Sequence, residues 1–254
     1  MRPLSIAQQL PRKFIPKETS AVPHRCSNPG AGGINVARAI AHLGGSATAI
    51  FPAGGATGEH LVSLLADENV PVATVEAKDW TRQNLHVHVE ASGEQYRFVM
   101  PGAALNEDEF RQLEEQVLEI ESGAILVISG SLPPGVKLEK FNPTDFRCAK
   151  TKGIRCIIDS SGEALSAALA IGNIELVKPN QKELSALVNR ELTQPDDVRK
   201  AAQEIVNSGK AKRVVVSLGP QGALGVDSEN CIQVVPPPVK SQSTVGAGDT
   251  WSAR

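Results

Sequence analysis

The sequence predicts an α/β fold in which helices flank a mostly parallel central sheet that carries a small β lid. Short apolar segments typical of buried strands, such as residues 124–129 and 154–159, alternate with segments of helical periodicity. This alternation favours right-handed crossovers and a parallel sheet between helical layers. Aromatic residues make up only 4% of the 254 residues, as in parallel sheets built from Val, Ile, Leu and Ala.

The first third of the chain is predicted to contain a helix, a buried strand and a second helix. Apolar residues recur at helical spacing over residues 35–43, and Gly44 supplies a C-terminal stop. Residues 47–51 are expected to form the strand. Thr57 is placed to cap the helix that follows this strand.

Residues 84–100 interrupt the α/β pattern, and we expect them to form the lid. Leu85, Val87 and Val89 alternate with polar residues, which is the period of a half-exposed strand. Ser92 and Gly93 then turn the chain into a second strand. The segment is therefore predicted to be a hairpin with one solvent-exposed face.

The remaining elements continue the alternation. Asn106 and Glu109 have the spacing of a capping box before the next helix. Further helices are predicted after Asn180 and from Pro195 to Gly209. The expected strands are residues 124–129, 154–159, 176–177 and 213–217, followed by two short strands that flank residues 227–230.

The composition excludes several classes of protein. The formal net charge is −2, whereas a nucleic-acid-binding domain is usually strongly basic. Apolar runs such as residues 124–128 are far shorter than the about 20 residues of a membrane span. The four cysteines form no C-x-x-C pair, which argues against structural zinc and favours reduced thiols. We therefore expect a cytoplasmic protein that binds neither nucleic acid nor membranes.

The segment that ends at Asp249 contains the sequence Gly246-Ala247-Gly248-Asp249. The two glycines allow the backbone to approach a ligand closely, and the free N–H groups of a helix start bind anions. Asp249 could take a proton from a substrate hydroxyl, while the amides stabilise charge on a transferred phosphoryl group. The alternative is an ordinary glycine turn whose aspartate caps a helix, and these four residues alone favour that alternative.

A second glycine-rich segment, residues 30–37, runs into the first predicted helix. It does not match a dinucleotide-binding fingerprint, because Asn35 stands where a third glycine is needed and no strand precedes Gly30. Asn35 instead offers an amide that can both donate to and accept from sugar hydroxyls. A simple helix-start turn explains the segment equally well.

Two further segments follow predicted strands, at the sheet edge where α/β proteins bind ligands. Asn180 and Glu183 share a helical face, and their oxygens suit Mg²⁺ with its waters and phosphates, but the pair also fits a capping box. Gly219 and Gly222 end another strand and could hold a ribose or adenine edge, or simply form a tight turn. No P-loop sequence occurs, which excludes that class of kinase.

Two polar side chains are candidates for binding a phosphate group. Ser131 follows the strand 124–129 and is therefore expected at the ligand edge. Arg82 precedes the lid, where its guanidinium could pair bidentately with a phosphate. The alternative for Arg82 is a solvated surface charge.

Together and in this order, these segments resemble the PfkB (ribokinase-like) sugar kinase family. The match spans residues 30–249, and the pairing of residues 32–35 with residues 246–249 is highly specific. Arg82 with residues 129–135 is similar to the subgroup that phosphorylates sugar phosphates. The resemblance implies a ribokinase-like domain over residues 30–254 and ATP- and Mg²⁺-dependent conversion of fructose 6-phosphate to fructose 1,6-bisphosphate.

The resemblance also implies a role for each motif. Asp249 is the implied base, and the backbone of Gly246, Ala247 and Gly248 is the implied anion hole. Glu183, with Asn180, would organise Mg²⁺, and members of the family commonly form a homodimer through the β lid. The implied substrate-binding residues are Gly32, Gly33, Asn35, Arg82 and Ser131. The implied nucleotide-binding residues are Lys178, Asn180, Ser217, Gly219, Gly222, Ser241 and Thr244.

Three blocks depart from the family pattern. Residues 1–29 lack the family's first strand and carry five basic residues against one acidic residue. Pro143 interrupts the helix expected over residues 141–152, and residues 250–254 stand where the family continues with a long helix. An irregular N-terminal segment or a targeting peptide explains only the first block. Our hypothesis is that all three are translated in a shifted reading frame, so the domain is expected to be incomplete at both ends and to have little activity.

Two other functions remain open. The same fold could act on another phosphosugar, such as fructose 1-phosphate or tagatose 6-phosphate. The chain could also be a catalytically dead protein that binds a nucleotide or a sugar. A dehydrogenase is disfavoured by Asn35 at the third glycine position.

Overall fold

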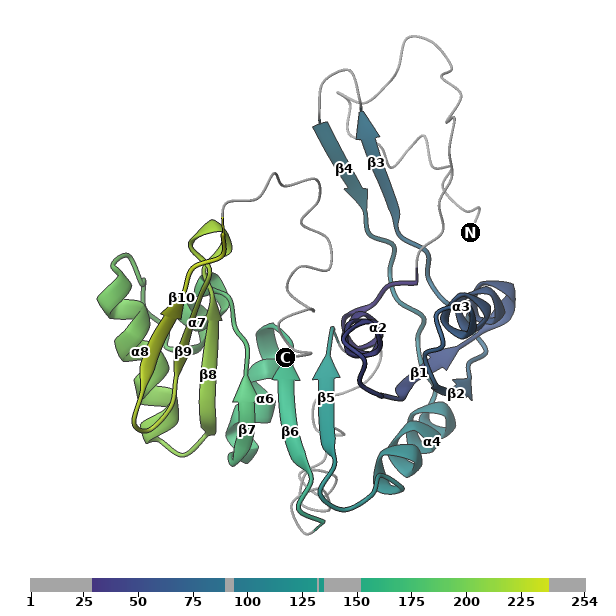
Figure 1. Cartoon of the computed structure of the whole chain (residues 1–254). Coiled ribbons are helices and arrows are strands. Elements are labelled where there is room, and N and C mark those ends of the chain that lie inside the picture. Colours follow the sequence, from purple (N-terminus) through teal and green to yellow (C-terminus); the bar gives the residue numbers. More distant parts are fainter. Residues whose placement is uncertain (1–28, 90–93, 132, 135–151, 238–254) are drawn as a thin grey trace.

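The structure of the chain is a computed structural model that describes residues 29–89, 94–131, 133–134 and 152–237 (Figure 1). The three blocks without family pattern lie outside the described residues, except for Pro29 and Lys152. The turn expected at residues 92–93 also lies outside them.

A six-stranded sheet with the order β10-β9-β8-β7-β6-β5 forms the centre of the larger part of the molecule. The strands β5 (Ile125–Ser129), β6 (Arg155–Asp159), β7 (Ile174–Val177) and β8 (Ala211–Ser217) pair in parallel. The strands β9 (Ala223–Val226) and β10 (Cys231–Val234) add an antiparallel edge. The predicted mostly parallel sheet is confirmed, and the carboxyl ends of its four parallel strands share one edge.

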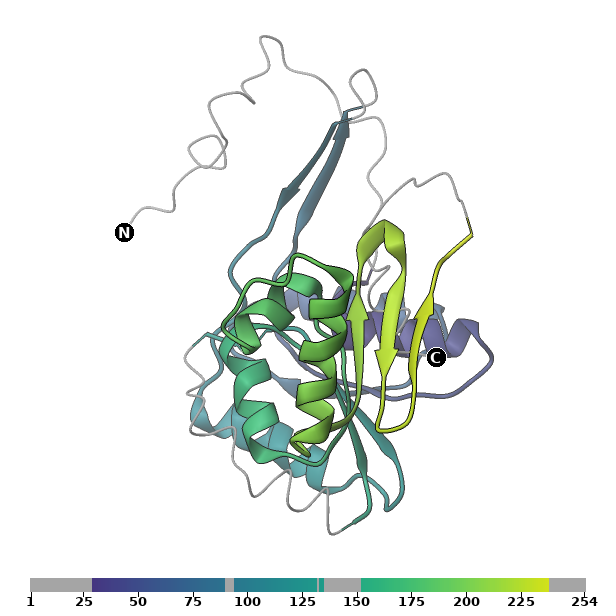
Figure 2. The same ribbon diagram turned by 90° about the vertical axis from the view of Figure 1, so that its left-hand side faces the viewer.

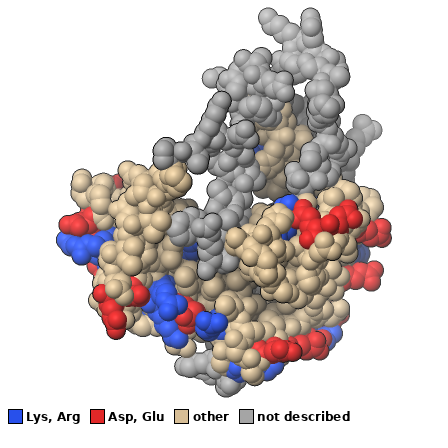
Figure 3. Space-filling model, viewed as in Figure 1, with Lys and Arg blue, Asp and Glu red and all other residues tan. Residues whose placement is uncertain are grey.

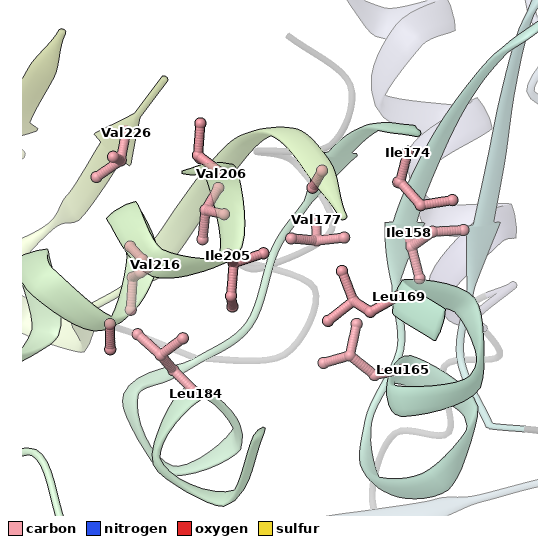
Figure 4. Packing of buried hydrophobic residues seen from close by; sticks show 14 of the residues in the cluster. Ile158, Leu165, Leu169, Ile174, Val177, Leu184, Ile205, Val206, Val216 and Val226 are labelled. Atoms are coloured by element: carbon pink, nitrogen blue, oxygen red, sulfur yellow. The ribbon is translucent and has the colours of Figure 1, made fainter. Parts of the chain in front are cut away.

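Three helices cover one face of this sheet: α6 (Gly162–Ile171), α7 (Gln181–Leu187) and α8 (Pro195–Asn207) (Figure 2). Because side chains alternate along a strand, Val214 and Val216 of β8 face these helices together, and neither is exposed to solvent. Both valines belong to one apolar cluster, in which Figure 4 shows Val216 beside Leu184 and other apolar side chains of the helices. The helix predicted from Pro195 is confirmed, whereas α6 was not expected.

The smaller part of the molecule has an apolar cluster of its own. It contains α2 (Gly32–His42), the parallel pair β1 (Ala49–Ala53) and β2 (Val72–Glu76), α3 (Gly55–Asp67) and α4 (Glu107–Leu118). α2 joins the two parts, because it contacts both β1 and β5. The buried members of this cluster are Ile34, Ala37, Ala49, Phe51, Leu65 and Val70.

Arg38 fastens α2 to the end of α3. Its Nε and Nη2 atoms each donate a hydrogen bond to the Glu68 carboxylate, at 2.6 Å. Its Nη1 atom donates to the carbonyl oxygen of Pro29 at 2.8 Å, which holds the chain entering α2. This bidentate pair lowers the pKa of Glu68, chiefly through the hydrogen bond from Arg38.

The lid is a hairpin of β3 (Leu85–Val89) and β4 (Glu94–Phe98), as predicted. Its base is closed by a hydrogen bond of 3.1 Å from Met100 N to Asn84 Oδ1. In Figure 1 the hairpin projects from the side of the molecule to which β5 and β6 point. It therefore lies on the same side as the carboxyl edge of the sheet.

Three local expectations were wrong. The helix expected over residues 35–43 begins at Gly32, so the glycines form its first turn. Gly54 rather than Thr57 is the N-cap of α3, because the helix begins at Gly55 and Thr57 lies inside its first turn. The strand at residues 124–129 was expected to be buried, but β5 is the last strand of the sheet within the described part of the chain, and Ile125 is 51% exposed.

The described surface carries charges of both signs without a large patch of either on the face shown in Figure 3. Among the described residues, no helix is long and apolar enough to cross a membrane.

Candidate functional site

The carboxyl edge of the six-stranded sheet gathers most of the described candidate residues. Main-chain hydrogen bonds continue the ladder past the strand ends, from Gly130 N to Asp159 O, from Lys178 N to Ile158 O and from Ser217 N to Pro179 O, each 3.0 Å long. Ser131, Lys178, Asn180 and Ser217 therefore leave neighbouring strands at one edge. This is the place where open α/β sheets bind ligands.

A buried ion pair lies at this edge. Lys178 Nζ is 3.0 Å from Asp159 Oδ1, and the two side chains are only 9% and 16% exposed. A buried charge is costly unless it is paired, so each of these groups offsets part of the cost of burying the other. The sequence patterns did not single out Asp159, although its place at the end of the predicted strand 154–159 could have done so.

Asn180 and Glu183 form the capping box that was left open as an alternative. Asn180 Oδ1 accepts a hydrogen bond of 3.0 Å from Glu183 N, and Glu183 Oε2 accepts one of 2.8 Å from Asn180 N. This arrangement starts α7 and fixes both side chains at the sheet edge. The capping box neither requires nor excludes a role of these residues at Mg²⁺, and that role stays a prediction.

The residues after β8 form a tight turn, η3 (Gly219–Gln221), as one alternative proposed. Gly219 and Gly222 both have positive φ, at 60° and 91°. A Cβ added at Gly222 would lie 1.9 Å from Val234 O, so glycine is needed there for close approach to the end of β10. The predicted contact of this turn with a nucleotide remains a prediction.

The glycine segment before α2 lies against the end of β5. A Cβ added at Gly32 would lie 2.2 Å from Ser129 Oγ and 3.2 Å from Gly130 N, whereas one added at Gly33 would meet no atom within 4 Å. Gly32 therefore allows the helix start to contact the sheet edge, and Gly33 leaves open space beside it. Asn35 follows in the first turn of α2, half-buried, so all three predicted sugar-binding residues lie near the end of β5.

Arg82 lies beside the loop that carries Ser131. The position of a Cβ on Gly102 is 3.4 Å from Arg82 Nη1 and 3.5 Å from Pro134 Cδ, so the guanidinium and this loop meet at Gly102. Arg82 and Ser131 are both exposed to solvent. The structure thus places the Arg82 guanidinium near Pro134, three residues after Ser131, and the shared role of Arg82 and Ser131 at a phosphate stays a prediction.

The predicted catalytic segment lies outside the described residues. This applies to Asp249, to the anion hole at Gly246, Ala247 and Gly248, and to the nucleotide-binding candidates Ser241 and Thr244. Within the described part of the chain, no group of three or more His, Cys, Asp or Glu side chains could hold a metal ion.

The family model of the pfkB family carbohydrate kinases matches residues 5–253. The chain belongs to this family. The resemblance inferred from the motifs is therefore confirmed, and so is the ribokinase-like fold.

Two curated relatives share the description ATP-dependent 6-phosphofructokinase isozyme 2. The protein of Escherichia coli (strain K12) is 94% identical over 222 residues, which cover 87% of this chain and 72% of that protein. The protein of Mycobacterium tuberculosis (strain CDC 1551 / Oshkosh) is 40% identical over 228 residues, which cover 89% of this chain and 66% of that protein. The chain thus spans about two thirds to three quarters of the length of these relatives.

Two solved structures of phosphofructokinase-2 from Escherichia coli have the same fold. The complex with fructose-6-phosphate matches with a TM-score of 0.86 and 86% identity, over 94% of this chain and 78% of that chain. The tetrameric inhibited form matches with a TM-score of 0.87 and 87% identity, over 94% and 79% of the two chains.

Proposed function

We propose that this chain is a kinase that transfers the γ-phosphoryl group of ATP to fructose 6-phosphate and produces fructose 1,6-bisphosphate. The observation that carries the proposal is the 94% identity over 222 residues to an ATP-dependent 6-phosphofructokinase. Within the pfkB family, substrates differ, so the identity to this particular kinase favours its reaction over those of other members.

The geometry of the described site supports a phosphosugar as the acceptor. The Arg82 guanidinium lies near Gly102 and Pro134, three residues after Ser131, and a guanidinium pairs bidentately with a phosphate. Gly33 leaves room for a sugar at the start of α2, and Gly32 lets this helix start lie against the end of β5. Lys178, Asn180 and Ser217 lie further along the same edge, where the nucleotide is proposed to bind.

The proposed chemistry takes place at Asp249. The sugar hydroxyl loses its proton to the Asp249 carboxylate as its oxygen forms a bond to the γ-phosphorus. The bond between that phosphorus and the oxygen bridging it to the β-phosphate breaks, and ADP leaves. The N–H groups of Gly246, Ala247 and Gly248 stabilise the charge on the transferred group.

The residues at the sheet edge fit an Mg²⁺ ion that is held largely by phosphates and water. Such an ion needs only one or two carboxylates from the protein. Glu183 uses Oε2 in the capping box and has no hydrogen-bond partner for Oε1 among the described residues. Glu183 and Asn180 are proposed to hold the ion through water, where it would neutralise charge on the ATP phosphates.

The remaining assignments complete the proposal. Residues 30–254 form the kinase domain, and two chains associate as a homodimer through the lid, where Leu85 is 49% exposed and Val99 is 61% exposed. The partners are the small-molecule substrates, with no nucleic acid and no membrane. A cytoplasmic location agrees with the free thiols of Cys156 and Cys231.

A coupled assay of ADP release from the purified 254-residue chain tests the function. Fructose 6-phosphate, fructose 1-phosphate and tagatose 6-phosphate are compared, and Asp249→Asn is the control. Since the sequence predicts little activity, we expect weak turnover that is highest with fructose 6-phosphate and that Asp249→Asn abolishes. Equal activity of the two proteins would show that Asp249 is not the base. Preference for another phosphosugar, or ATP binding without turnover, would overturn the proposed reaction.

A further inference from the structure

We propose that Thr57 and Thr81 form a clasp that positions Arg82 for the phosphate of the sugar substrate. Thr57 Oγ1 donates a hydrogen bond of 2.7 Å to Thr81 O, across 24 residues of sequence. Thr81 is the residue immediately before Arg82. The inference rests on the proposed function, because it gives these two threonines a part in the recognition of that substrate.

The clasp holds Thr81 at two backbone atoms and at its side-chain oxygen. Besides the bond to Thr81 O, Thr81 N donates to Gly54 O at 2.9 Å, and Gly54 N donates to Thr81 Oγ1 at 3.0 Å. Gly54 is the N-cap of α3, and the helix has no side-chain cap of its own. Thr81 therefore supplies the missing cap from another part of the chain, which ties the segment to a rigid element.

The start of α3 is shaped to let this segment approach. A Cβ added at Gly54 would lie 2.1 Å from Asp79 O, and one added at Gly58 would lie 3.1 Å from Thr81 Oγ1. Both glycines are buried. Any larger residue at either position would push residues 79–81 away from the helix and would displace Arg82 with them.

The segment is also held at its other end. Lys78 N donates a hydrogen bond of 2.8 Å to Glu109 Oε1, and Ala77 N donates to Ala53 O at 3.0 Å. Residues 77–81 are thus fixed between α4, β1 and α3. Arg82 is the next residue after this fixed segment, and its guanidinium lies near Gly102 and Pro134.

The arrangement favours a positioning role over a purely structural one. Arg82 has a long, exposed side chain, so contacts of that side chain do not by themselves fix the position of its backbone. A bidentate bond to phosphate needs the guanidinium in a defined place, and a misplacement of about 1 Å at such a contact can cost up to about 100-fold. The hydrogen bonds to Thr81, the residue before Arg82, fix the backbone from which the guanidinium extends, and they leave the proposed phosphate site free.

The test measures the affinity of the 254-residue chain for fructose 6-phosphate and for ATP by titration calorimetry. Thr57→Val keeps the shape of the side chain and removes the hydroxyl donor. We expect it to weaken fructose 6-phosphate binding about tenfold and to leave ATP binding unchanged. Thr57→Ser, which keeps the hydroxyl, should restore the affinity, and the exposed Thr193→Val serves as the control.

A double-mutant cycle separates positioning from structure. If Thr57 acts through Arg82, Thr57→Val has no further effect on fructose 6-phosphate binding once Arg82→Ala is present. Equal weakening on both backgrounds, equal loss of ATP affinity or no loss with Thr57→Val would overturn the inference. Thr81→Val, measured the same way, replaces Thr57→Val if that variant does not fold. A parent chain that binds no fructose 6-phosphate would instead contradict the proposed function.

Discussion

Lys178 and Asp159 form an ion pair, with 3.0 Å between Nζ and Oδ1, at the ends of two neighbouring parallel strands. The side chains are 9% and 16% exposed, and the pair lies beside the residues proposed to bind the nucleotide. The pair therefore places a fixed positive and a fixed negative charge where phosphates and a metal ion would meet the protein.

Replacing one partner of this pair is expected to destabilise the fold more than replacing both partners. Lys178→Met removes the ammonium group that lies 3.0 Å from the Asp159 carboxylate and should lower the free energy of unfolding by about 3 kcal/mol. The double variant Lys178→Met/Asp159→Asn should regain a large part of that loss. Urea denaturation of the parent, the single variants Lys178→Met and Asp159→Asn, and the double variant measures this, and strictly additive effects would show that the pair is not coupled.

Gly32 and Gly33 are expected to respond differently to alanine. Gly32→Ala places a methyl group against Ser129 Oγ and should lower stability by about 1–3 kcal/mol. Gly33→Ala meets no atom within 4 Å and should leave the melting temperature unchanged or slightly raised. If Gly33 leaves room for the sugar, Gly33→Ala should still weaken fructose 6-phosphate binding, and an unchanged affinity would remove Gly33 from the site.

Replacing the Glu183 carboxylate by an amide separates the proposed metal role of this residue from its capping role. Glutamine also completes a capping box, so Glu183→Gln should keep the stability of the chain. Without the charge, it should reduce the enhancement of ATP binding by Mg²⁺ about tenfold or more, measured by titration calorimetry with and without the ion. Glu109→Gln is the matched control, because Glu109 completes the same capping box with Asn106 on α4. A similar loss in both variants would exclude a metal role for Glu183.

The Arg38–Glu68 pair is expected to make stability depend on pH. The folded state lowers the pKa of Glu68, chiefly through the hydrogen bond from Arg38, so its contribution is complete above the unfolded pKa. It is lost as the pH falls from about 5 through the lower pKa of the folded state. Compared with Glu68→Gln, the parent should be more stable by about 0.5–1 kcal/mol at pH 7, and the difference should vanish near pH 3. A constant difference across this range, measured by urea denaturation, would contradict this assignment.

Local sequence signals predicted the elements whose cause is local. Both capping boxes follow from residues three apart, and the structure contains each of them with both of its hydrogen bonds. The order of strands and helices, and hence the ligand edge, also followed from periodicity. α6 was not expected, because its own apolar and small residues lie on several of its sides and form no clear apolar stripe.

Contacts between distant segments were not predictable in this way. Thr57 has the residue type of a helix cap, and only the tertiary fold shows that its hydroxyl reaches Thr81. Lys178 was assigned to the nucleotide without its partner Asp159, because two strands separated by a helix bring them together. The exposure of Ile125 has the same origin, since an apolar strand does not reveal whether it lies at a sheet edge.

The presence of two apolar clusters affects how often each part of the molecule opens by local unfolding. Gly32 and Arg82 belong to the smaller part around β1 and β2, whereas Lys178 and Asn180 belong to the larger sheet. Regions with fewer buried contacts open more often, so amide hydrogens of the smaller part should exchange with deuterium sooner. A substrate that contacts both parts would slow this exchange most in β1 and α3, so binding would make the less stable part as rigid as its neighbour.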